Sequence, residues 1–392
     1  MRTDQAVGLV REGGPQRTTL LELFFDLAFV AALALISRTL AHNLDAGGVL
    51  HAVVHLMAIW WVWSVTALVT DLHHPQRPPI FVMTLWAMLG AILMAGALPT
   101  AFSSHAIVFA GAYVAIHVGR GIFLVSALSG RQARLHVGRF IFWFLVSAVP
   151  WLAGGLVSGT ARGLLWAAGL AIDYGSAWLR YPTPRLGRVP MSQYRVAADH
   201  LAERYQQFFT LALGDLILVT VLTYADNDLT GGRTAALLAA FAATVLLWQI
   251  YVYRAGALLQ AAIESSRDPG RFVRSSPYTH VLMVAGVVAA AAGFEIVIAH
   301  PTEHPTPWLV GVILGGPALF LAGRIRFEYE VFSRVSPSRL VGLLVLAVSA
   351  PAMVLVPALM AALAGTLVLA GIAVSDAIRA YGNPAEPPAP AL

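Results

Sequence analysis

The sequence predicts an all-α integral membrane protein with about twelve transmembrane helices, and three observations lead to this prediction. Hydrophobic residues make up 58% of the 392-residue chain and charged residues only 11%, whereas soluble domains average about 25% charged residues. The mean hydropathy is +0.73. Apolar stretches of about 18 to 22 residues follow one another from Leu20 to Arg379, and about 20 helical residues cross the ~30 Å hydrocarbon core of a bilayer.

Short polar breaks divide the apolar stretches into twelve expected spans. These cover residues 20–38, 48–69, 80–100, 105–127, 137–157, 162–180, 205–224, 233–257, 279–299, 307–324, 338–360 and 362–380. The first span follows several arginines, as the apolar region of a signal peptide would. Because Glu22 and Asp26 interrupt that region and many spans follow it, we interpret it as an anchored helix.

Arginines concentrate in alternate loops, which predicts the orientation. The even-numbered loops contain Arg77, Arg131, Arg134, Arg185, Arg188, Arg195, Arg267, Arg271, Arg274, Arg326 and Arg334, whereas the odd-numbered loops contain little beyond Arg162 and Arg233. By the positive-inside rule, both termini face the cytoplasm. We therefore expect a multi-pass protein of the inner (plasma) membrane.

Short motifs recur in the same order in the two halves of the chain, which predicts two parallel six-helix repeats. The recurring pairs are Phe24-Phe25 with Phe208-Phe209, Gly47-Gly48 with Gly231-Gly232, and Gly119-Arg120 with Gly323-Arg324. An insertion of about twenty residues between Arg267 and Tyr278 would explain why the offset increases from 184 to 204. Since six is an even number, both halves insert with the same orientation, and a cavity is expected between them.

Five segments follow from these boundaries. They are a cytoplasmic N-terminal segment (1–19), the first repeat (20–181), a cytoplasmic linker (182–204), the second repeat (205–381) and a tail (382–392). Four prolines among the last ten residues predict a disordered tail.

Composition also excludes several kinds of chemistry and one class of partner. The chain has no cysteine, which excludes disulfides, thiolate metal sites and cysteine nucleophiles. All 25 cationic side chains are arginines, so Schiff-base chemistry and a phosphate-binding lysine are excluded too. The net charge of +5 does not indicate nucleic acid, because the arginines lie at helix ends and form no basic stripe.

Four segments resemble motifs of the bacterial low temperature requirement protein A family. They are Leu21-Glu22-Leu23-Phe24-Phe25-Asp26-Leu27-Ala28-Phe29-Val30, Trp60-Trp61-Val62-Trp63 with Thr70-Asp71, His200-Leu201-Ala202-Glu203-Arg204, and Ala212-Leu213-Gly214-Asp215. The similarity extends from about residue 17 to residue 381. Asp215 stands where the family pattern leads us to expect glutamate. The resemblance implies an integral membrane protein and specifies no reaction.

Four carboxylates in the expected spans are candidate catalytic groups, because a charge inside a membrane span costs about 2.5–3.5 kcal/mol. They are Glu22, Asp26, Asp173 and Asp215. Glu22 and Asp26 are four residues apart and share one helix face. In the alternative interpretation, these two form an interfacial group that binds one arginine.

The candidate substrate-binding residues are arginines, polar neighbours and tryptophans. They are Arg120, Arg204, Arg324, His200, Glu203, Trp60 and Trp63. A guanidinium presents a planar fork that suits phosphate or carboxylate, and aromatic faces stabilise cations. The alternatives are arginines that extend to lipid headgroups, an interfacial salt-bridge cluster, and tryptophans that pack against lipid.

Most of the candidate charges lie toward the cytoplasmic side. Glu22, Asp26, Asp71, Arg120, Asp173, His200, Glu203, Arg204 and Arg324 do so, with Asp215 nearer the middle. The sequence thus predicts one polar site that opens toward the cell interior.

Three functions are compatible with such a site. The first is a membrane-embedded enzyme for a lipophilic substrate, such as a terpene cyclase or a prenyl transferase, with Mg²⁺ as a cofactor if the substrate is a diphosphate. Against it, the chain has no Asp-Asp-x-x-Asp motif, and its metal ligands are unknown. The second possible function is a proton-coupled transporter in which Asp215 carries the proton. The third is a non-catalytic sensor or assembly factor. The expected partners are the lipid bilayer and a lipophilic small molecule.

Overall fold

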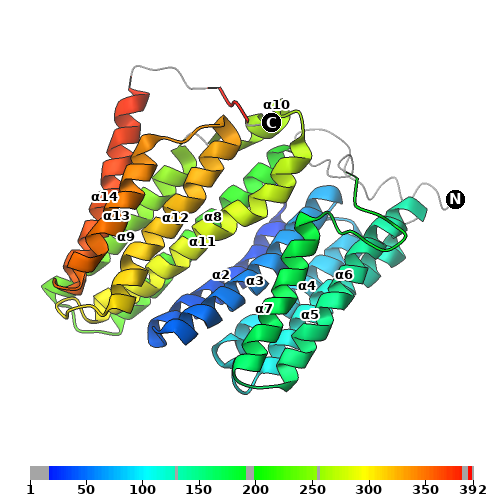
Figure 1. The fold of residues 1–392 in the computed structure, drawn as a ribbon, viewed down its shortest axis with the longest axis horizontal. Coiled ribbons are helices and arrows are strands. Elements are labelled where there is room, and N and C mark those ends of the chain that lie inside the picture. The colour runs from blue at the N-terminus through cyan, green and yellow to red at the C-terminus, as the bar shows by residue number, and fades with distance from the viewer. Residues whose placement is uncertain (1–16, 129–130, 191–197, 254–256, 382–386, 391–392) are drawn as a thin grey trace. The chain divides into compact units, whose positions relative to one another are not determined.

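The computed structural model confirms the all-α class. It describes residues 17–128, 131–190, 198–253, 257–381 and 387–390, which contain thirteen α-helices and no strand. The helices (Figure 1) are α2 (Leu20–His42), α3 (Ala46–Leu72), α4 (Pro78–Ala97), α5 (Ala106–Ala127), α6 (Arg131–Leu156), α7 (Thr160–Trp178), α8 (Ala198–Ala225), α9 (Gly231–Tyr251), α10 (Ala257–Ser265), α11 (Pro269–Ala299), α12 (Pro307–Phe332), α13 (Pro337–Met353) and α14 (Ala358–Ala380).

Ten helices in the described part of the chain are long and apolar enough to cross a membrane. Of the twelve expected spans, those at 162–180 and 338–360 do not meet this standard. The first corresponds to α7, a helix of 19 residues that carries Arg162 and Asp173. The second corresponds to α13, which has 17 residues and ends two residues after Pro351. A multi-pass membrane protein is supported, whereas the count of twelve is not confirmed.

The chain divides into two compact units. Unit 1 comprises Met1–Leu35, Val53–Arg204 and Pro269–Arg274, and unit 2 comprises Ile36–Ala52, Tyr205–Asp268 and Ser275–Leu392. The five predicted segments stay a prediction. Residues 1–16 of the N-terminal segment, and 382–386 and 391–392 of the tail, lie outside the described residues. In the described part of the tail, the backbone N–H of Ala389 donates to the carbonyl of Val331 on α12 at 3.0 Å.

In unit 1, helices α4 to α7 lie side by side in chain order (Figure 1). Gly119 on α5 leaves room for the indole of Trp86 on α4, because a Cβ at Gly119 would lie 2.5 Å from the indole nitrogen. That nitrogen donates to the carbonyl of Ala115 at 3.0 Å. Gly119 therefore allows α4 and α5 to pack closely, as small residues do between membrane helices.

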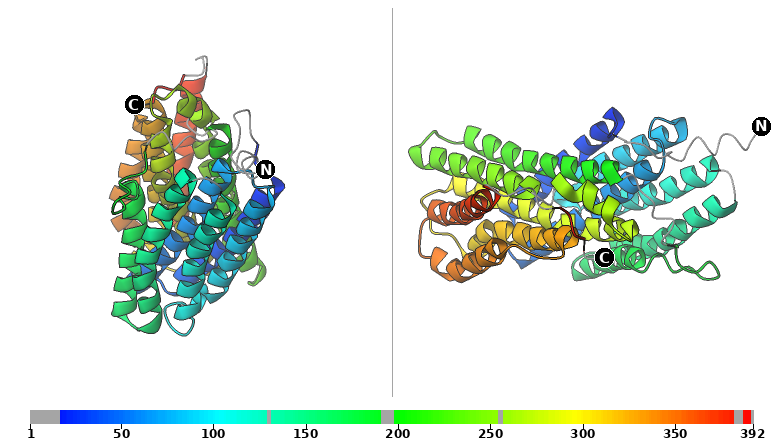
Figure 2. Two further views of the ribbon diagram at one scale, coloured as in Figure 1. Left: turned by 90° about the vertical axis from the view of Figure 1, so that its right-hand side faces the viewer. Right: turned by 90° about the horizontal axis from the view of Figure 1, so that it is seen from above.

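In unit 2, α12 packs against α13 and α14, and α9 packs against α14 (Figure 2). Helices α11 and α12 approach closely where Gly286 meets Gly316. A Cβ on Gly286 would lie 2.6 Å from the carbonyl oxygen of Gly316 and 2.5 Å from the amide nitrogen of Phe320. Backbone contact of this kind replaces side-chain interdigitation in helix pairs that small residues bring together.

Candidate functional site

The first turns of α2 and α8 meet α3 in a buried network of unit 1. Arg204 on α8 donates to both carboxylate oxygens of Asp26 on α2, at 2.7 and 2.8 Å, and its guanidinium lies 5.6 Å from the ring centre of Trp63 on α3. The Trp63 indole donates to the same carboxylate at 2.8 Å and stacks on Trp60 at 4.9 Å. Both oxygens of Asp26 are thus held by fixed donors, and Trp63 acts as a hydrogen-bond donor as well as an aromatic surface.

His200 lies one turn before Arg204 and bridges two carboxylates. Its Nε2 lies 2.9 Å from Glu22 Oε1, and its Nδ1 lies 2.9 Å from Asp71 Oδ1 at the end of α3. The other Glu22 oxygen accepts from the backbone N–H and the hydroxyl of Thr19, both at 2.9 Å, in a capping box that starts α2. Glu22 and Asp26 therefore contact different side chains, His200 and Arg204, whereas the alternative interpretation predicted that one arginine binds both.

Glu203 lies at the edge of this network and contacts a different partner. Its carboxylate accepts from the backbone N–H of Thr18 at 2.9 Å. His200 and Arg204 are 0% and 1% exposed, and Glu22, Asp26 and Asp71 are also buried. We call these five residues, together with Trp63, the α2/α3/α8 network. Because each of its three carboxylates contacts His200 or Arg204, the network can hold three helices in register.

Arg120 on α5 is a buried cation without an anionic partner. It is 2% exposed, and its guanidinium donates to the Thr66 hydroxyl at 2.6 Å and the Val62 carbonyl at 3.4 Å on α3. A third contact, at 3.2 Å, joins it to Nδ1 of His117. All three partners are neutral or serve as acceptors in neutral form, and Arg120 Nε has no hydrogen-bond partner. Among the described residues, no carboxylate lies within salt-bridge distance of Arg120.

His117 and Tyr113 lie on the same face of α5 as Arg120. Because His117 Nδ1 accepts from Arg120, its proton belongs on Nε2, which has no partner. Tyr113, one turn earlier, donates to Asp173 Oδ2 on α7 at 2.7 Å. The indole of Trp151 donates to the same oxygen at 3.4 Å. Seven residues separate Tyr113 from Arg120, which is about 10 Å along the helix.

Asp173 is the acidic counterpart of Arg120 in this unit. It is 1% exposed, and the hydroxyl of Ser147 on α6 is its further polar neighbour. Within the described residues, no arginine or histidine lies within salt-bridge distance of its carboxyl group. Along one face of α5, unit 1 therefore buries the Asp173 carboxyl group and the Arg120 guanidinium, and neither has an oppositely charged partner among the described residues.

Aromatic rings surround this face of α5. Tyr113 lies 4.3 Å from Trp151, and His117 stacks on Phe144 at 4.3 Å. Further ring contacts, with centroids 4.9 to 6.3 Å apart, join Phe102, Phe109, Trp151 and Trp166. Such rings exclude water and present electron-rich faces, which suit a cationic centre.

Arg324 on α12 has a different environment from Arg120, although the sequence places the two at equivalent positions. In unit 2, its guanidinium donates to the carbonyls of Ile250 and Tyr253 at 2.8 and 2.7 Å, where α9 ends. Glycine precedes both arginines, and Gly323 makes room for Met283 as Gly119 does for Trp86. Arg324 thus satisfies carbonyls at a helix C-terminus, a common structural use of arginine.

Asp215 is a buried carboxyl group of unit 2. It is 0% exposed, its Oδ1 accepts from the Ser37 hydroxyl at 3.4 Å, and its Oδ2 has no hydrogen-bond partner. Glu295 on α11 is its acidic neighbour and lies 3.8 Å from Arg38.

Several partners were not among the predicted site residues. These are Thr66 and Tyr113 and, in unit 2, Glu328, Arg339 and Asp376. The last three form buried ion pairs in which Arg339 contacts both carboxylates. Arg339 and Asp376 lie inside expected spans, so the cost of a charge in the membrane was a usable signal for them. Within the described part of the chain, no group of three or more histidine or acidic side chains could hold a metal ion.

Comparison with known proteins agrees with the fold. Residues 17–374 match the family described as bacterial low temperature requirement A protein. An uncharacterized protein of Rhizobium meliloti (strain 1021) is 34% identical over 322 residues, which cover 81% of this chain and 78% of that protein. No solved structure matches. The chain therefore belongs to the bacterial low temperature requirement A family.

Proposed function

We propose that this chain is a membrane-embedded enzyme that acts on a lipophilic substrate with an anionic head, of which an isoprenyl diphosphate is the model compound. One observation supports the proposal most strongly. Unit 1 buries the Arg120 guanidinium and the Asp173 carboxyl group, neither has an oppositely charged partner among the described residues, and the Tyr113–His117–Arg120 face of α5 connects them. An anion at one end and a reacting carbon at the other would complete this arrangement.

Arg120 is the proposed anion-binding residue. A buried cation is costly unless an anion compensates it, and guanidinium nitrogens match phosphate oxygens in geometry. Its present partners, Thr66 and Val62, are neutral. On binding a phosphate, Arg120 would replace these hydrogen bonds with stronger ones to a charged acceptor. His117 Nε2, an unpartnered donor one turn away, would add a second contact.

Asp173 is the proposed acid. An ionised carboxylate without a countercharge is costly among aromatic rings, so this residue suits the transfer of a proton to an alkene. The step breaks the O–H bond of the acid, forms a C–H bond at the less substituted alkene carbon and leaves a carbocation beside the carboxylate. Trp151 and Phe109 present π-faces to that cation, and return of a neighbouring C–H proton to the carboxylate yields a new alkene.

The α2/α3/α8 network is proposed to support this site. Trp63 contacts Asp26, and Thr66, one turn further along α3, contacts Arg120. The network thereby fixes the segment of α3 that positions the guanidinium. Mg²⁺ would enter this site only together with a diphosphate substrate.

A turnover assay with matched variants tests the enzyme proposal. Purified full-length protein in detergent is incubated with geranylgeranyl diphosphate, with and without Mg²⁺. Because the proposed step keeps the bond to the diphosphate, isomerised diphosphate products are dephosphorylated and analysed by gas chromatography and mass spectrometry. We expect Asp173→Asn and Arg120→Gln to lose at least about 100-fold of the activity. The controls Asp215→Asn and Arg324→Gln should retain it. Activity that survives Asp173→Asn, or products absent from the wild type, would contradict the proposal.

Proton-coupled transport is the second candidate, because Asp215 combines burial, one oxygen without a partner and an acidic neighbour. A carboxyl group of this kind can carry a proton through a membrane protein. In proteoliposomes, a pH gradient would drive uptake of a lipophilic solute, and Asp215→Asn would abolish uptake while Asp173→Asn would not. The opposite pattern of the two variants supports the enzyme.

We also propose the predicted topology, with cytoplasmic termini and two parallel repeats. Two contacts within unit 1, both between residues 178 positions apart, support a parallel course for the first turns of α2 and α8, the first helices of the expected repeats. Because the chain has no cysteine, single introduced cysteines report loop location directly. Arg77→Cys should react with an impermeant maleimide only after permeabilisation, and Asp228→Cys in intact cells. The reverse labelling would overturn the orientation.

A further inference from the structure

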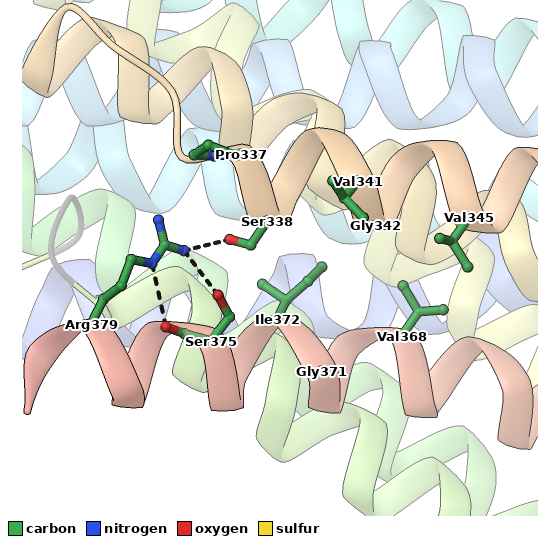
Figure 3. Close-up of a pocket in the computed structure, with 10 residues that line it drawn as sticks. All are labelled: Pro337, Ser338, Val341, Gly342, Val345, Val368, Gly371, Ile372, Ser375 and Arg379. Atoms are coloured by element: carbon green, nitrogen blue, oxygen red, sulfur yellow. Dashed lines mark hydrogen bonds between the residues drawn. The ribbon is translucent and has the colours of Figure 1, made fainter.

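A groove in unit 2 runs between α13 and α14, and its two ends differ in polarity. Its volume is about 540 Å³. Figure 3 shows its length lined by apolar side chains, with Ser338, Ser375 and Arg379 at one end. Val341 and Val345 are 57% and 44% exposed, so the groove lies on an outer face of the unit.

The polar end of the groove is built around Arg379. Its guanidinium donates to the Ser338 hydroxyl at 2.6 Å, to Asp376 at 2.9 Å and to the Ser375 carbonyl at 3.3 Å. The Arg379 side chain is 35% exposed, whereas that of Asp376 is 3% exposed. The arginine thus reaches the mouth of the groove while its neighbours hold it in place.

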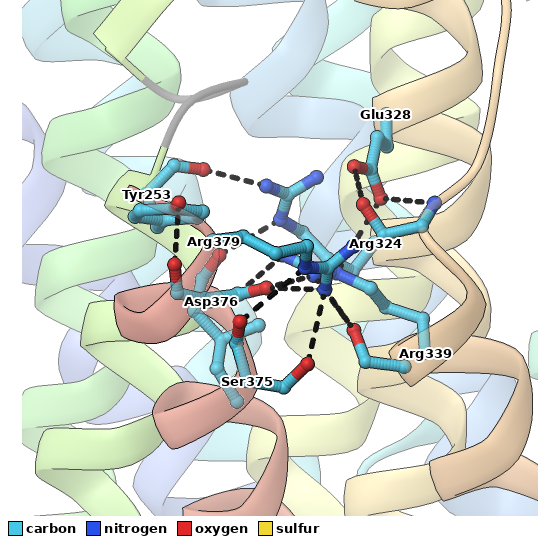
Figure 4. A network of polar contacts seen from close by, with 10 residues as sticks. Tyr253, Arg324, Glu328, Arg339, Ser375, Asp376 and Arg379 are labelled. Carbon is cyan, nitrogen blue, oxygen red and sulfur yellow. Dashed lines mark hydrogen bonds and ion pairs between the residues drawn. The ribbon is translucent and has the colours of Figure 1, made fainter. Parts of the chain in front are cut away.

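Positive charge exceeds negative charge behind this end (Figure 4). Three arginines, Arg324, Arg339 and Arg379, surround two carboxylates, Glu328 and Asp376. Arg339 forms ion pairs with both carboxylates, and Arg379 forms a second ion pair with Asp376. The cluster retains an excess of one positive charge, and Arg379 is its exposed member.

We propose that the groove binds an anionic phospholipid, with the phosphate at Arg379 and one acyl chain along the apolar lining. The charge excess and the two serine hydroxyls suit a phosphate oxygen. The N-terminus of α13, at Pro337 and Ser338, adds the favourable end of a helix dipole. An acyl chain fits the remaining lining because valine, isoleucine and glycine leave no polar group along it.

Two variants with matched controls test the site. Arg379→Gln removes the exposed charge, and its control, Arg334→Gln, removes an exposed charge from the loop before α13. Gly371→Phe fills the groove, because a Cβ at Gly371 meets open space. Its control, Gly311→Phe, places the same ring at an exposed glycine of α12 that also faces open space.

Native mass spectrometry of the full-length protein gives the readout, with phosphatidylglycerol and phosphatidylcholine of identical acyl chains as probes. We expect phosphatidylglycerol to bind at least fivefold more tightly, and Arg379→Gln to reduce that preference about fivefold, as for one arginine near an anionic headgroup. Gly371→Phe should reduce binding of the lipid, and both controls should behave as the wild type.

Three results would overturn the proposal. The first is equal binding of the two lipids by the wild type. The second is an unchanged preference in Arg379→Gln together with unchanged binding in Gly371→Phe. The third is displacement of phosphatidylglycerol by inorganic phosphate at equal concentration, which would assign the site to a soluble anion. If Arg379→Gln does not fold, Gly371→Phe alone decides the matter.

Discussion

The Asp26–Arg204 pair allows a quantitative prediction about stability. Asp26→Asn keeps the shape of the side chain but removes the charge that Arg204 contacts through two hydrogen bonds of 2.7 and 2.8 Å. Because Arg204 is 1% exposed, its charge then lies buried without the carboxylate that it contacts directly. Loss of one member of a buried ion pair costs about 3–5 kcal/mol. At about 2 °C per kcal/mol for a large chain, the unfolding midpoint should fall by about 6–10 °C.

A double-mutant cycle measures whether the two residues act together. Thermal unfolding of purified protein in detergent, followed by tryptophan fluorescence, is compared for Asp26→Asn, Arg204→Gln and the combination. The double variant should recover at least about 2 kcal/mol relative to the sum of the single losses. The control Asp228→Asn, at an exposed loop position, should change stability by less than about 0.5 kcal/mol. Losses at Asp26 and Arg204 that simply add would refute the reasoning.

Two further predictions concern packing and the second carboxylate pair. His200→Phe leaves Glu22 and Asp71 without their shared donor, so we expect it to destabilise the protein by at least about 2 kcal/mol in the same unfolding assay; an unchanged midpoint would show that the bridge contributes nothing. Gly286→Leu forces α11 and α12 apart and should cost at least about 1–3 kcal/mol, whereas Gly311→Leu, which meets open space, should have little effect. Similar melting of the two glycine variants would contradict the close helix contact.

Hydropathy predicted the helical class and most helix positions, because length and apolar content alone decide whether a segment can cross a bilayer. The same argument predicted spans at α7 and α13, which the structure does not confirm. Arg162 and Asp173 make α7 polar, and α13 ends after Pro351. Helical periodicity also placed His200 and Arg204 on one face, where the structure finds them contacting the same network.

Periodicity could not assign partners, because it describes one helix at a time. Nothing in the spacing of Asp26 and Glu22 shows that one contacts Arg204 and the other His200. The predicted equivalence of Arg120 and Arg324 gave no sign that Arg324 contacts carbonyls at the C-terminus of a helix whereas Arg120 contacts the middle of α3. That difference depends on where α9 ends relative to α12, and it separates a structural arginine from the candidate anion site.

An experimental structure with a bound substrate analogue tests the central claim most directly. Full-length protein in nanodiscs is imaged by electron cryomicroscopy with a non-hydrolysable prenyl thiodiphosphate. We predict phosphate density within hydrogen-bond distance of the Arg120 guanidinium, and the prenyl chain directed along α5 toward Asp173. An analogue bound elsewhere, with Arg120 still on Thr66 and Val62, would contradict the assignment of this face of α5 as the active site.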